Sequence, residues 1–265
     1  MDQSLVASAA SRANEQHLNG HIAVVTGGSS GIGAACVRLL AAHGARVVIG
    51  YNRGEARAEE LRASLPGEGH RCAHIPLERD EASDAALSAL TAELAKEGGK
   101  VDVLVNSAGF TQRIAHSDLD SLTPELFDRI LSANATGTYS VIRAFMPLLR
   151  ESRDAVVINI SSVSAFTGLG SNIAYCAAKA ATDTMTQSFA RAFGDGIRFL
   201  SVSPASVDTD FVAGRNREEL QSKAEKTPLG RIVTPEDVAS SVLACITHLR
   251  TATGARIVID GGHTL

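Results

Sequence analysis

The stretch HIAVVTGGSSGIG, residues 21–33, joins an apolar run to a glycine-rich turn and to the start of a helical pattern. The run at 21–27 is continuously apolar, as a strand buried on both faces of a sheet would be. Apolar positions then recur at helical spacing until Gly44, a typical residue for the end of a helix. This order predicts the first unit of an α/β sheet, with the turn as a candidate phosphate-binding loop.

Three glycines of this turn have separate predicted roles. Gly27 permits a tight turn, Gly31 lets the backbone approach a pyrophosphate, and Gly33 lets the helix pack closely on the strand. The unpaired N–H groups at the helix N-terminus then attract the phosphates. A turn that merely happens to be rich in glycine is the alternative, so the motif needs support from the rest of the chain.

The same alternation of apolar runs and amphipathic segments continues to the C-terminus. The predicted strands after the first are 45–51, 71–77, 101–109, 155–162, 197–204 and 254–260. The predicted helices after the first are 53–65, 80–97, 123–150, 172–193 and one that begins at Thr234. This pattern indicates a Rossmann-type doubly wound, predominantly parallel seven-stranded sheet with helices on both faces. We expect one domain over 21–265, preceded by a loosely ordered extension at 1–20.

Composition and charge exclude several classes of function. The 265 residues carry a formal net charge of −4 and no basic run, which argues against nucleic acid or an anionic membrane as a partner. The four cysteines and eight histidines are scattered without the spacing of a metal site, so we expect no metal and reduced thiols. The sequence contains no apolar stretch of about 20 residues, so we expect no membrane span. The N-terminus is a poor match to a signal peptide. The expected location is the cytoplasm.

The segment AYCAAKA, 174–180, places Tyr175 and Lys179 one helical turn apart, so their side chains are neighbours. A cation beside a phenol favours the phenolate and lowers a pKa that is ordinarily about 10. The pair is a candidate acid/base site, although alone it could be a surface tyrosine beside a solvated lysine. Gly27, Asn106, Ser162 and Pro204 all follow predicted strand ends, the edge at which doubly wound sheets bind ligands. The helix face with the pair is therefore expected to line one crevice with them.

The spacing T-G-x-x-x-G-x-G at 26–33 resembles that of the short-chain dehydrogenase/reductase family, and the resemblance covers roughly residues 20–265. Further segments match the family in order: VLVNSAG (103–109), Asn134 in LSANATGTYS, NISS (159–162) before Y-x-x-x-K, PLGR (228–231), TPEDVA (234–239) and IDGG (259–262). Overall similarity is to 3-oxoacyl-acyl-carrier-protein reductases and related carbonyl reductases. The segment 205–228 resembles the family's substrate lid.

The resemblance implies an oxidoreductase that interconverts a ketone and a secondary alcohol, with a 3-oxoacyl thioester as a candidate substrate. It implies that Tyr175 is the acid/base, that Lys179 lowers its pKa and binds the nicotinamide ribose, and that Ser162 positions the carbonyl. Asn134 is implied to anchor a proton-relay water, although it could simply pair with backbone. Ser161 stays the alternative to Ser162. An NAD-dependent alcohol or sugar dehydrogenase and a non-catalytic dinucleotide-binding sensor or scaffold are the competing hypotheses.

The second predicted strand is followed by Arg53, with no acid until Glu55. An acid there would repel a 2′-phosphate, whereas Arg53 could pair with one, so we expect NADP(H), with NAD(H) as the alternative. The residues that the resemblance places on the cofactor are Gly27, Ser29, Ser30, Gly31, Ile32, Gly33, Asn52, Arg53, Asn106, Ala108, Gly109, Tyr175, Lys179, Pro204, Ala205, Val207 and Thr209.

The chain also departs from the family pattern. Ser107 replaces the second asparagine of N-N-A-G, Ala205 replaces a glycine, and Leu77 lies near the place of an adenine-contacting aspartate. In the lid, Phe211 could cover an apolar substrate, and Arg215, Arg217 and Lys223 could meet an anionic one or form a solvated helix face. The resemblance also implies a small-molecule substrate and a homotetramer or homodimer, formed through 123–150, 172–193 and the C-terminal strand.

Overall fold

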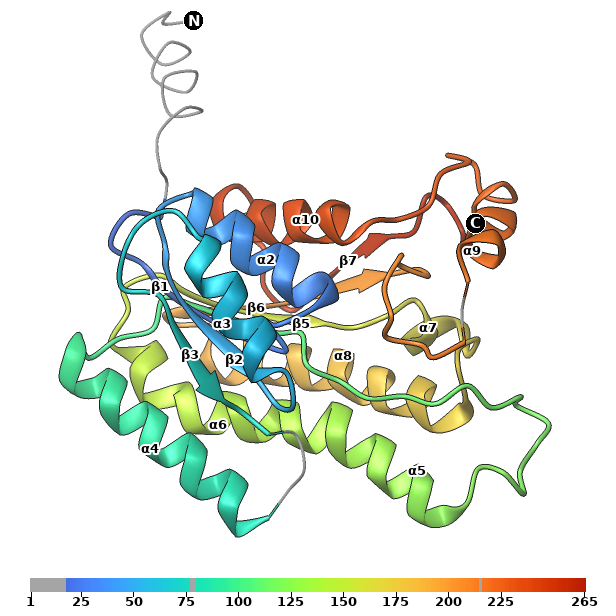
Figure 1. Ribbon diagram of the computed structural model, residues 1–265, viewed down its shortest axis with the longest axis horizontal. Coiled ribbons are helices and arrows are strands. Elements are labelled where there is room, and N and C mark those ends of the chain that lie inside the picture. The colour runs from blue at the N-terminus through green and yellow to red at the C-terminus, as the bar shows by residue number, and fades with distance from the viewer. Residues whose placement is uncertain (1–17, 77–79, 215) are drawn as a thin grey trace, which may run out of the picture.

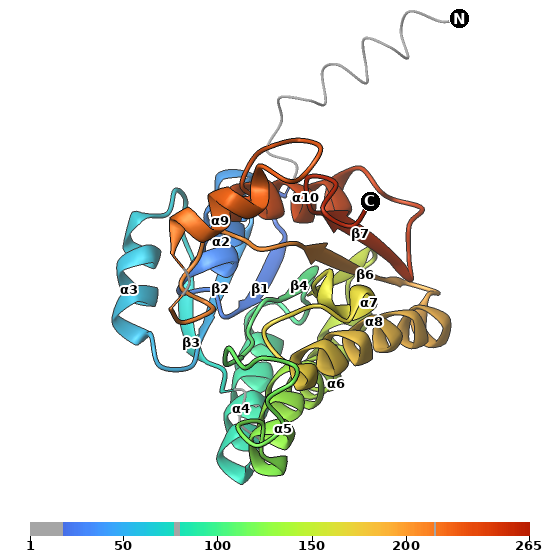
Figure 2. The same cartoon turned by 90° about the vertical axis from the view of Figure 1, so that its right-hand side faces the viewer.

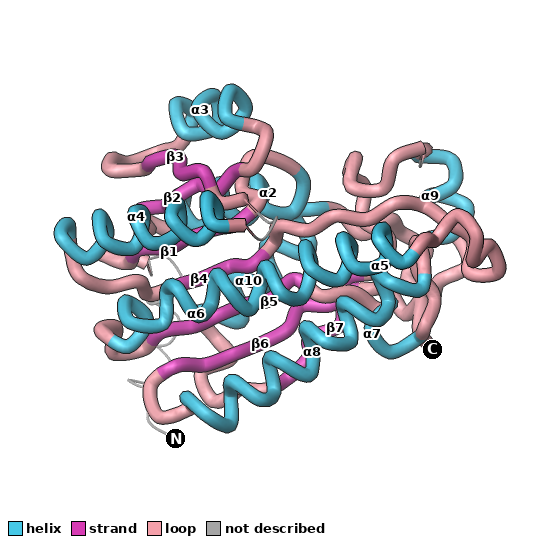
Figure 3. The backbone as a smooth tube through the Cα atoms, turned by 90° about the horizontal axis from the view of Figure 1, so that it is seen from below, coloured by secondary structure: helices cyan, strands magenta, loops and turns pink. Residues whose placement is uncertain are grey.

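Seven parallel strands form the central sheet of the structure, a computed structural model that describes residues 18–76, 80–214 and 216–265 (Figure 1). In spatial order the strands run β3-β2-β1-β4-β5-β6-β7, as Figure 3 shows from below. Their bounds are Ile22–Thr26 (β1), Arg46–Tyr51 (β2), Arg71–His74 (β3), Val103–Asn106 (β4), Ala155–Ile160 (β5), Ile197–Pro204 (β6) and Ala255–Ile259 (β7). The predicted seven-stranded, doubly wound sheet is confirmed, and all of its pairings are parallel.

Helices cover both faces of the sheet because parallel strands need helical crossovers. One face carries α2 (Gly31–Ala42), α3 (Glu55–Ser64) and α10 (Pro235–Thr247), and the other carries α4 (Glu81–Glu97), α6 (Gly137–Arg150) and α8 (Ile173–Phe193) (Figure 2). Neighbouring residues of β1 point to opposite faces of the sheet. Val25 therefore belongs to the core under α2, α3 and α10, and Val24 belongs to the core under α4, α6 and α8. Every residue of β1 is buried, as its unbroken apolar run predicts.

The order of the strands places a crevice at the ends of β1 and β4. The chain leaves β1 toward β2 and β3 on one side and returns to β4 on the other, so the loops after these two strands diverge. In register, Thr26 at the end of β1 pairs with Asn106 at the end of β4. Ligands bind doubly wound sheets at such a switch point.

The predicted helix over 123–150 is one continuous path with an irregular centre. Thr123 caps α5 (Pro124–Leu131) by accepting the Leu126 N–H at 3.3 Å, as the sequence indicates. A π-helical turn, Ser132–Thr136, then separates α5 from α6. It carries Asn134, and π-turns inside helices often mark functional positions. Two short helices that the sequence analysis did not delimit, α7 (Ser164–Thr167) and α9 (Arg217–Ala224), lie near the C-terminal edge of the sheet.

The prediction of a loose extension over 1–20 is wrong at its C-terminal end. The side chain of Leu18 is buried in the same core as residues of β1 and α2, because it is apolar. Its backbone N–H donates to the carbonyl of His43 at 3.0 Å. Residues 1–17 lie outside the described part of the chain. Within the described residues, the helices are too short or too polar to cross a membrane.

Candidate active site

The glycine turn after β1 is packed directly on the end of β4. Gly27 has φ +64°, and a Cβ at this residue would lie 2.8 Å from the Ala108 Cα, so only glycine satisfies both the backbone and the contact. The Thr26 hydroxyl accepts the N–H groups of Ser107 and Ala108, each at 3.2 Å. A Cβ at Gly33 would lie 2.2 Å from the Gly27 carbonyl oxygen, which confirms its predicted role in close helix packing.

The N-terminus of α2 fits a phosphate group. Ser30 is the N-cap but makes no side-chain capping bond, and the first turn contains no acid. The first N–H groups of a helix have no partner within it, and together they carry a partial positive charge. Gly31 has φ +51°, and its missing Cβ would approach Thr209 at 3.3 Å, so the glycine keeps this part of the wall open. These features suit the pyrophosphate of a dinucleotide.

Helix α8 carries both Tyr175 and Lys179, and Asn172 fixes where it begins. The Asn172 side chain is fully buried; its carbonyl oxygen accepts the Tyr175 backbone N–H at 2.7 Å. Its amide donates to Thr111 Oγ1 at 3.2 Å and to the Gln112 carbonyl at 2.7 Å. One side chain therefore caps the helix at the candidate acid/base and ties it to the loop after β4. The sequence analysis missed this role, although asparagine before a helical pattern is a capping signal.

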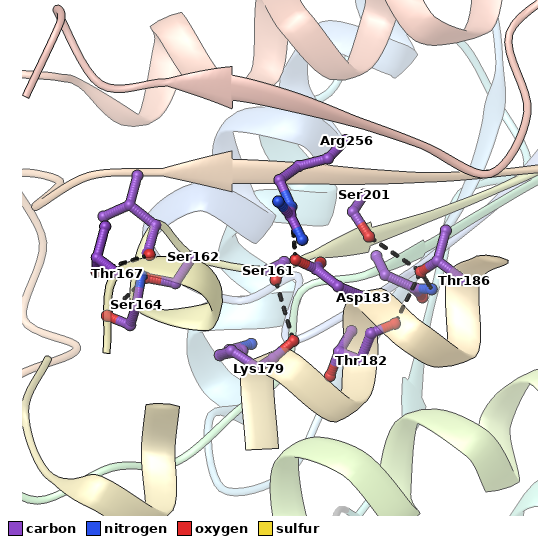
Figure 4. Close-up of polar contacts among 12 residues, drawn as sticks. Ser161, Ser162, Ser164, Thr167, Lys179, Thr182, Asp183, Thr186, Ser201 and Arg256 are labelled. Atoms are coloured by element: carbon purple, nitrogen blue, oxygen red, sulfur yellow. Dashed lines mark hydrogen bonds and ion pairs between the residues drawn. The ribbon is translucent and has the colours of Figure 1, made fainter. Parts of the chain in front are cut away.

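Lys179 is buried beside Tyr175, with 6% of its surface exposed. Its Nζ donates to the Ile160 carbonyl at 2.8 Å and lies 5.6 Å from the centroid of the Tyr175 ring. Burial lowers the pKa of Lys179 to about 8, against the opposing effect of Asp183 one turn further along α8. Asp183 is itself paired with Arg256 at 2.7 Å (Figure 4). The ammonium is thus supported by a carbonyl and a nearby carboxylate, with the desolvation cost only partly offset.

Ser161 and Ser162 both line the cleft but differ in what holds them. The Ser161 hydroxyl donates to the Lys179 backbone carbonyl at 3.4 Å, which joins the end of β5 to α8. The Ser162 hydroxyl instead meets the Ser164 hydroxyl and the Ser164 N–H, each at 3.1 Å (Figure 4). Both hydroxyls therefore donate to a partner within the protein, and the choice of Ser162 over Ser161 stays a prediction.

The glycine turn, the serines and the pair on α8 line one cleft of about 1510 Å³, a volume that holds a dinucleotide together with a small substrate. The expected residues on its wall are Gly27, Ser29, Ser30, Gly31, Ile32, Asn52, Arg53, Ala108, Gly109, Ser162, Tyr175, Lys179, Pro204, Ala205, Val207 and Thr209. Their contact with a cofactor stays a prediction. Within the described residues, no group of histidine, cysteine or acidic side chains could hold a metal ion.

Three expected site residues lie behind the cleft wall rather than on it. Gly33 packs against the glycine turn, and the Asn106 amide donates to Asn159 Oδ1 at 2.9 Å inside the sheet. The Asn134 amide donates to the carbonyls of Phe110 at 2.6 Å and Ile130 at 2.9 Å. Only the amide N–H groups are engaged in this way, since the side-chain oxygens of Asn106 and Asn134 have no hydrogen-bond partner among the described residues. Contact of Gly33 and Asn106 with the cofactor and the proton-relay role of Asn134 therefore stay predictions.

Two arginines on the cleft wall escaped the sequence analysis. Arg57 lies four residues after Arg53, in the first turn of α3, and its guanidinium and the Ser29 hydroxyl each lie within 3 Å of where a Cβ on Gly54 would be. Arg113 lies in the loop after β4, where no motif marks it. Of the positions discussed from sequence, Leu77 and Arg215 lie outside the described residues.

The sequence profile described as enoyl-(acyl carrier protein) reductase matches residues 27–264. The chain belongs to the short-chain dehydrogenase/reductase family. It is 36% identical over 245 residues to a Streptomyces violaceoruber protein named as ketoacyl reductase 2 of granaticin polyketide synthase, covering 91% of this chain and 95% of the relative. It is 33% identical to the cis-4-hydroxycyclohexanecarboxylate dehydrogenase of Sinomonas cyclohexanicum, covering 92% and 96%.

Solved structures of short-chain dehydrogenases/reductases share the fold. A dehydrogenase/reductase from Sinorhizobium meliloti superposes with a TM-score of 0.82 at 30% identity, over 95% of this chain and 98% of that one. The predicted family and enzyme class are confirmed. This member of the family is an oxidoreductase that acts on alcohols or ketones with a nicotinamide dinucleotide.

Proposed function

We propose that this protein is an NADP(H)-dependent oxidoreductase that interconverts a ketone and a secondary alcohol, with a 3-oxoacyl thioester as the first substrate to test. The observation that carries the proposal is the convergence of Tyr175, Lys179 and Ser162 on the cleft that the glycine turn also lines. The relative named as a ketoacyl reductase supports the substrate.

In this proposal, the three side chains divide the handling of the carbonyl oxygen. Ser162 donates a hydrogen bond where negative charge develops during reduction. Tyr175 gives the oxygen its proton and takes it back in the reverse direction. Lys179, one helical turn away, has its ammonium over the Tyr175 ring and favours the phenolate by its charge. Asn172 holds Tyr175 by its backbone N–H and so fixes the geometry of the transfer.

A bound nicotinamide dinucleotide would supply or accept the hydride at this site. The residues that would hold it form two groups. The glycine turn and the N-terminus of α2 would bind the pyrophosphate, and Asn52, Arg53 and Arg57 would surround the adenosine ribose. The wall residues that follow β2, which are Asn52, Arg53, Gly54 and Arg57, include two arginines and no acid, which supports the choice of a 2′-phosphorylated dinucleotide.

The proposal is tested by following consumption of NADPH and NADH by the purified protein with acetoacetyl thioester, and then with a panel of ketones and alcohols. We expect turnover with NADPH and a much weaker reaction with NADH. Turnover with NADH alone would overturn the cofactor assignment. Silence across the panel with NADPH still bound would favour a non-catalytic binding protein.

We also propose that the protein assembles as a homotetramer or homodimer. Exposed apolar side chains occur on α7, α8 and β7, where Phe166 is 41%, Ile173 38% and Val258 40% exposed. Apolar groups on neighbouring elements suit contact with a second copy. Sedimentation of the purified protein tests this, and a monomer at micromolar concentration would overturn it.

A further inference from the structure

The lid helix α9 and the loop after β4 meet in an ion-pair cluster on the cleft wall that the chemistry above does not use. The Arg113 guanidinium holds the Glu219 carboxylate with two bonds, of 2.9 and 3.2 Å. The Lys223 ammonium binds the same carboxylate at 2.8 Å. Two cations therefore share one acid, and the fork of Arg113 is already shaped around a carboxylate.

The cluster has a fixed side and a lid side. Arg113 follows Thr111 and Gln112, which Asn172 ties to the start of α8, and the next residue, Ile114, donates its N–H to the Ser171 carbonyl at 2.8 Å. Arg113 is thus attached to the helix that carries Tyr175. Glu219 and Lys223 instead belong to α9, which is separated from this loop by about a hundred residues of sequence.

The lid also reaches the candidate acid/base itself. The ring of Phe211 lies against that of Tyr175, with centroids 6.0 Å apart and planes tilted by 52°. The lid therefore places an apolar group on Tyr175 and a carboxylate on Arg113. These are the two contacts that an apolar keto acid would make in the same cleft.

We propose that Arg113 and Lys223 form a subsite for a substrate carboxylate remote from the reacting carbonyl, and that Glu219 occupies this subsite until the substrate displaces it. Exchange of one carboxylate for another keeps the bonds of the guanidinium fork, while Glu219 passes to water. The bonds from Lys223 and Arg113 lower the pKa of Glu219 to about 2, as expected of a site that stabilises a carboxylate anion. The inference rests on the proposed function, because ketone reduction at Tyr175 gives the subsite its purpose.

The test compares kcat/KM for 5-oxohexanoate with that for its methyl ester, which has the same ketone but no charge. The acid-to-ester ratio should fall about threefold in Arg113→Gln, since the lost bonds involve a charged partner on a side chain that is 55% exposed. Arg113→Lys should recover it only partly, because lysine lacks the planar fork. In Glu219→Gln the ratio should rise, since no resident carboxylate competes. Lys226→Gln removes a neighbouring exposed charge outside the cleft wall and should leave the ratio unchanged.

Calorimetric titration of 5-oxohexanoate into the protein with NADPH present gives a readout that does not require turnover. Binding in wild type that weakens about threefold in Arg113→Gln supports the subsite. The subsite is overturned if wild type and Arg113→Gln bind 5-oxohexanoate equally well. It is also overturned if their acid-to-ester ratios are equal. If neither ketone is reduced, the proposed function fails for this substrate class, and the titration alone then decides the subsite. If the ester is reduced but the acid-to-ester ratio does not change in Arg113→Gln, the subsite is overturned and the proposed function stands.

Discussion

Replacement of Asn172 by alanine should weaken the site and the fold together, because this buried side chain makes three hydrogen bonds at the start of α8. Loss of an N-cap costs about 1 kcal/mol. Loss of the bond to the partly buried Gln112 carbonyl costs about another 1 kcal/mol, whereas Thr111 keeps its contact with the Ser171 hydroxyl at 2.6 Å. The free energy of unfolding in urea should therefore fall by about 2 kcal/mol. Because the cap is made to the Tyr175 N–H, kcat should fall about tenfold or more.

Serine at the same position separates the two contributions. The Asn172→Ser hydroxyl can still cap the helix but is too short to reach the Gln112 carbonyl, so about half of the lost stability should return. The kcat should recover with the cap rather than with the loop contact. An alanine variant that unfolds within about 0.5 kcal/mol of wild type, or one that loses stability with kcat unchanged, would refute this reasoning.

Three further perturbations test separate parts of the structure. The Gly27→Ala variant should lose about 2 kcal/mol or more of stability in urea unfolding and should bind NADPH more weakly. Alanine is unfavourable in a left-handed backbone, and its Cβ would meet Ala108. A variant as stable as wild type would contradict this. Burial lowers the pKa of Lys179 from 10.5 to about 8, so between these pH values the unfolded chain binds more protons than the folded one. The free energy of unfolding of wild type should therefore rise with pH relative to Lys179→Met over that window, and a fall would have the wrong sign. The double change Arg53→Gln, Arg57→Gln should raise KM for NADPH about tenfold and leave that for NADH nearly unchanged, and equal effects on both would argue against a 2′-phosphate site.

The fold could be predicted because its determinants are local in sequence. Continuous apolar runs such as 21–27 need burial on both faces, and parallel packing with helical crossovers is the arrangement that supplies it. Boundaries were less certain: the run at 101–109 forms a strand only over Val103–Asn106, because the residues after it turn into the cleft. The π-helical turn at Asn134 has no signature in its own residues and depends on packing against neighbouring helices.

The site was predictable in part for the same reason. The spacing of Tyr175 and Lys179 and the position of Gly27 follow from one helix and one turn. The hydrogen-bond partners of Asn106 and Asn134 could not be read in this way, because Asn159 and Phe110 are distant from them along the chain. The contact of Arg113 with the lid is likewise a product of tertiary structure.

The role proposed for Tyr175, as the group that handles the proton of a carbonyl reduction with NADPH, is best tested with the Tyr175→Phe variant. Two quantities should be measured side by side on the same preparation: the Kd for NADPH, by fluorescence titration, and kcat for the best ketone found. Phenylalanine keeps the ring against Phe211 and removes only the hydroxyl. We expect an unchanged Kd and a loss of kcat of about 10²–10⁴-fold. A variant that binds NADPH normally and still turns over within a few-fold of wild type would contradict it.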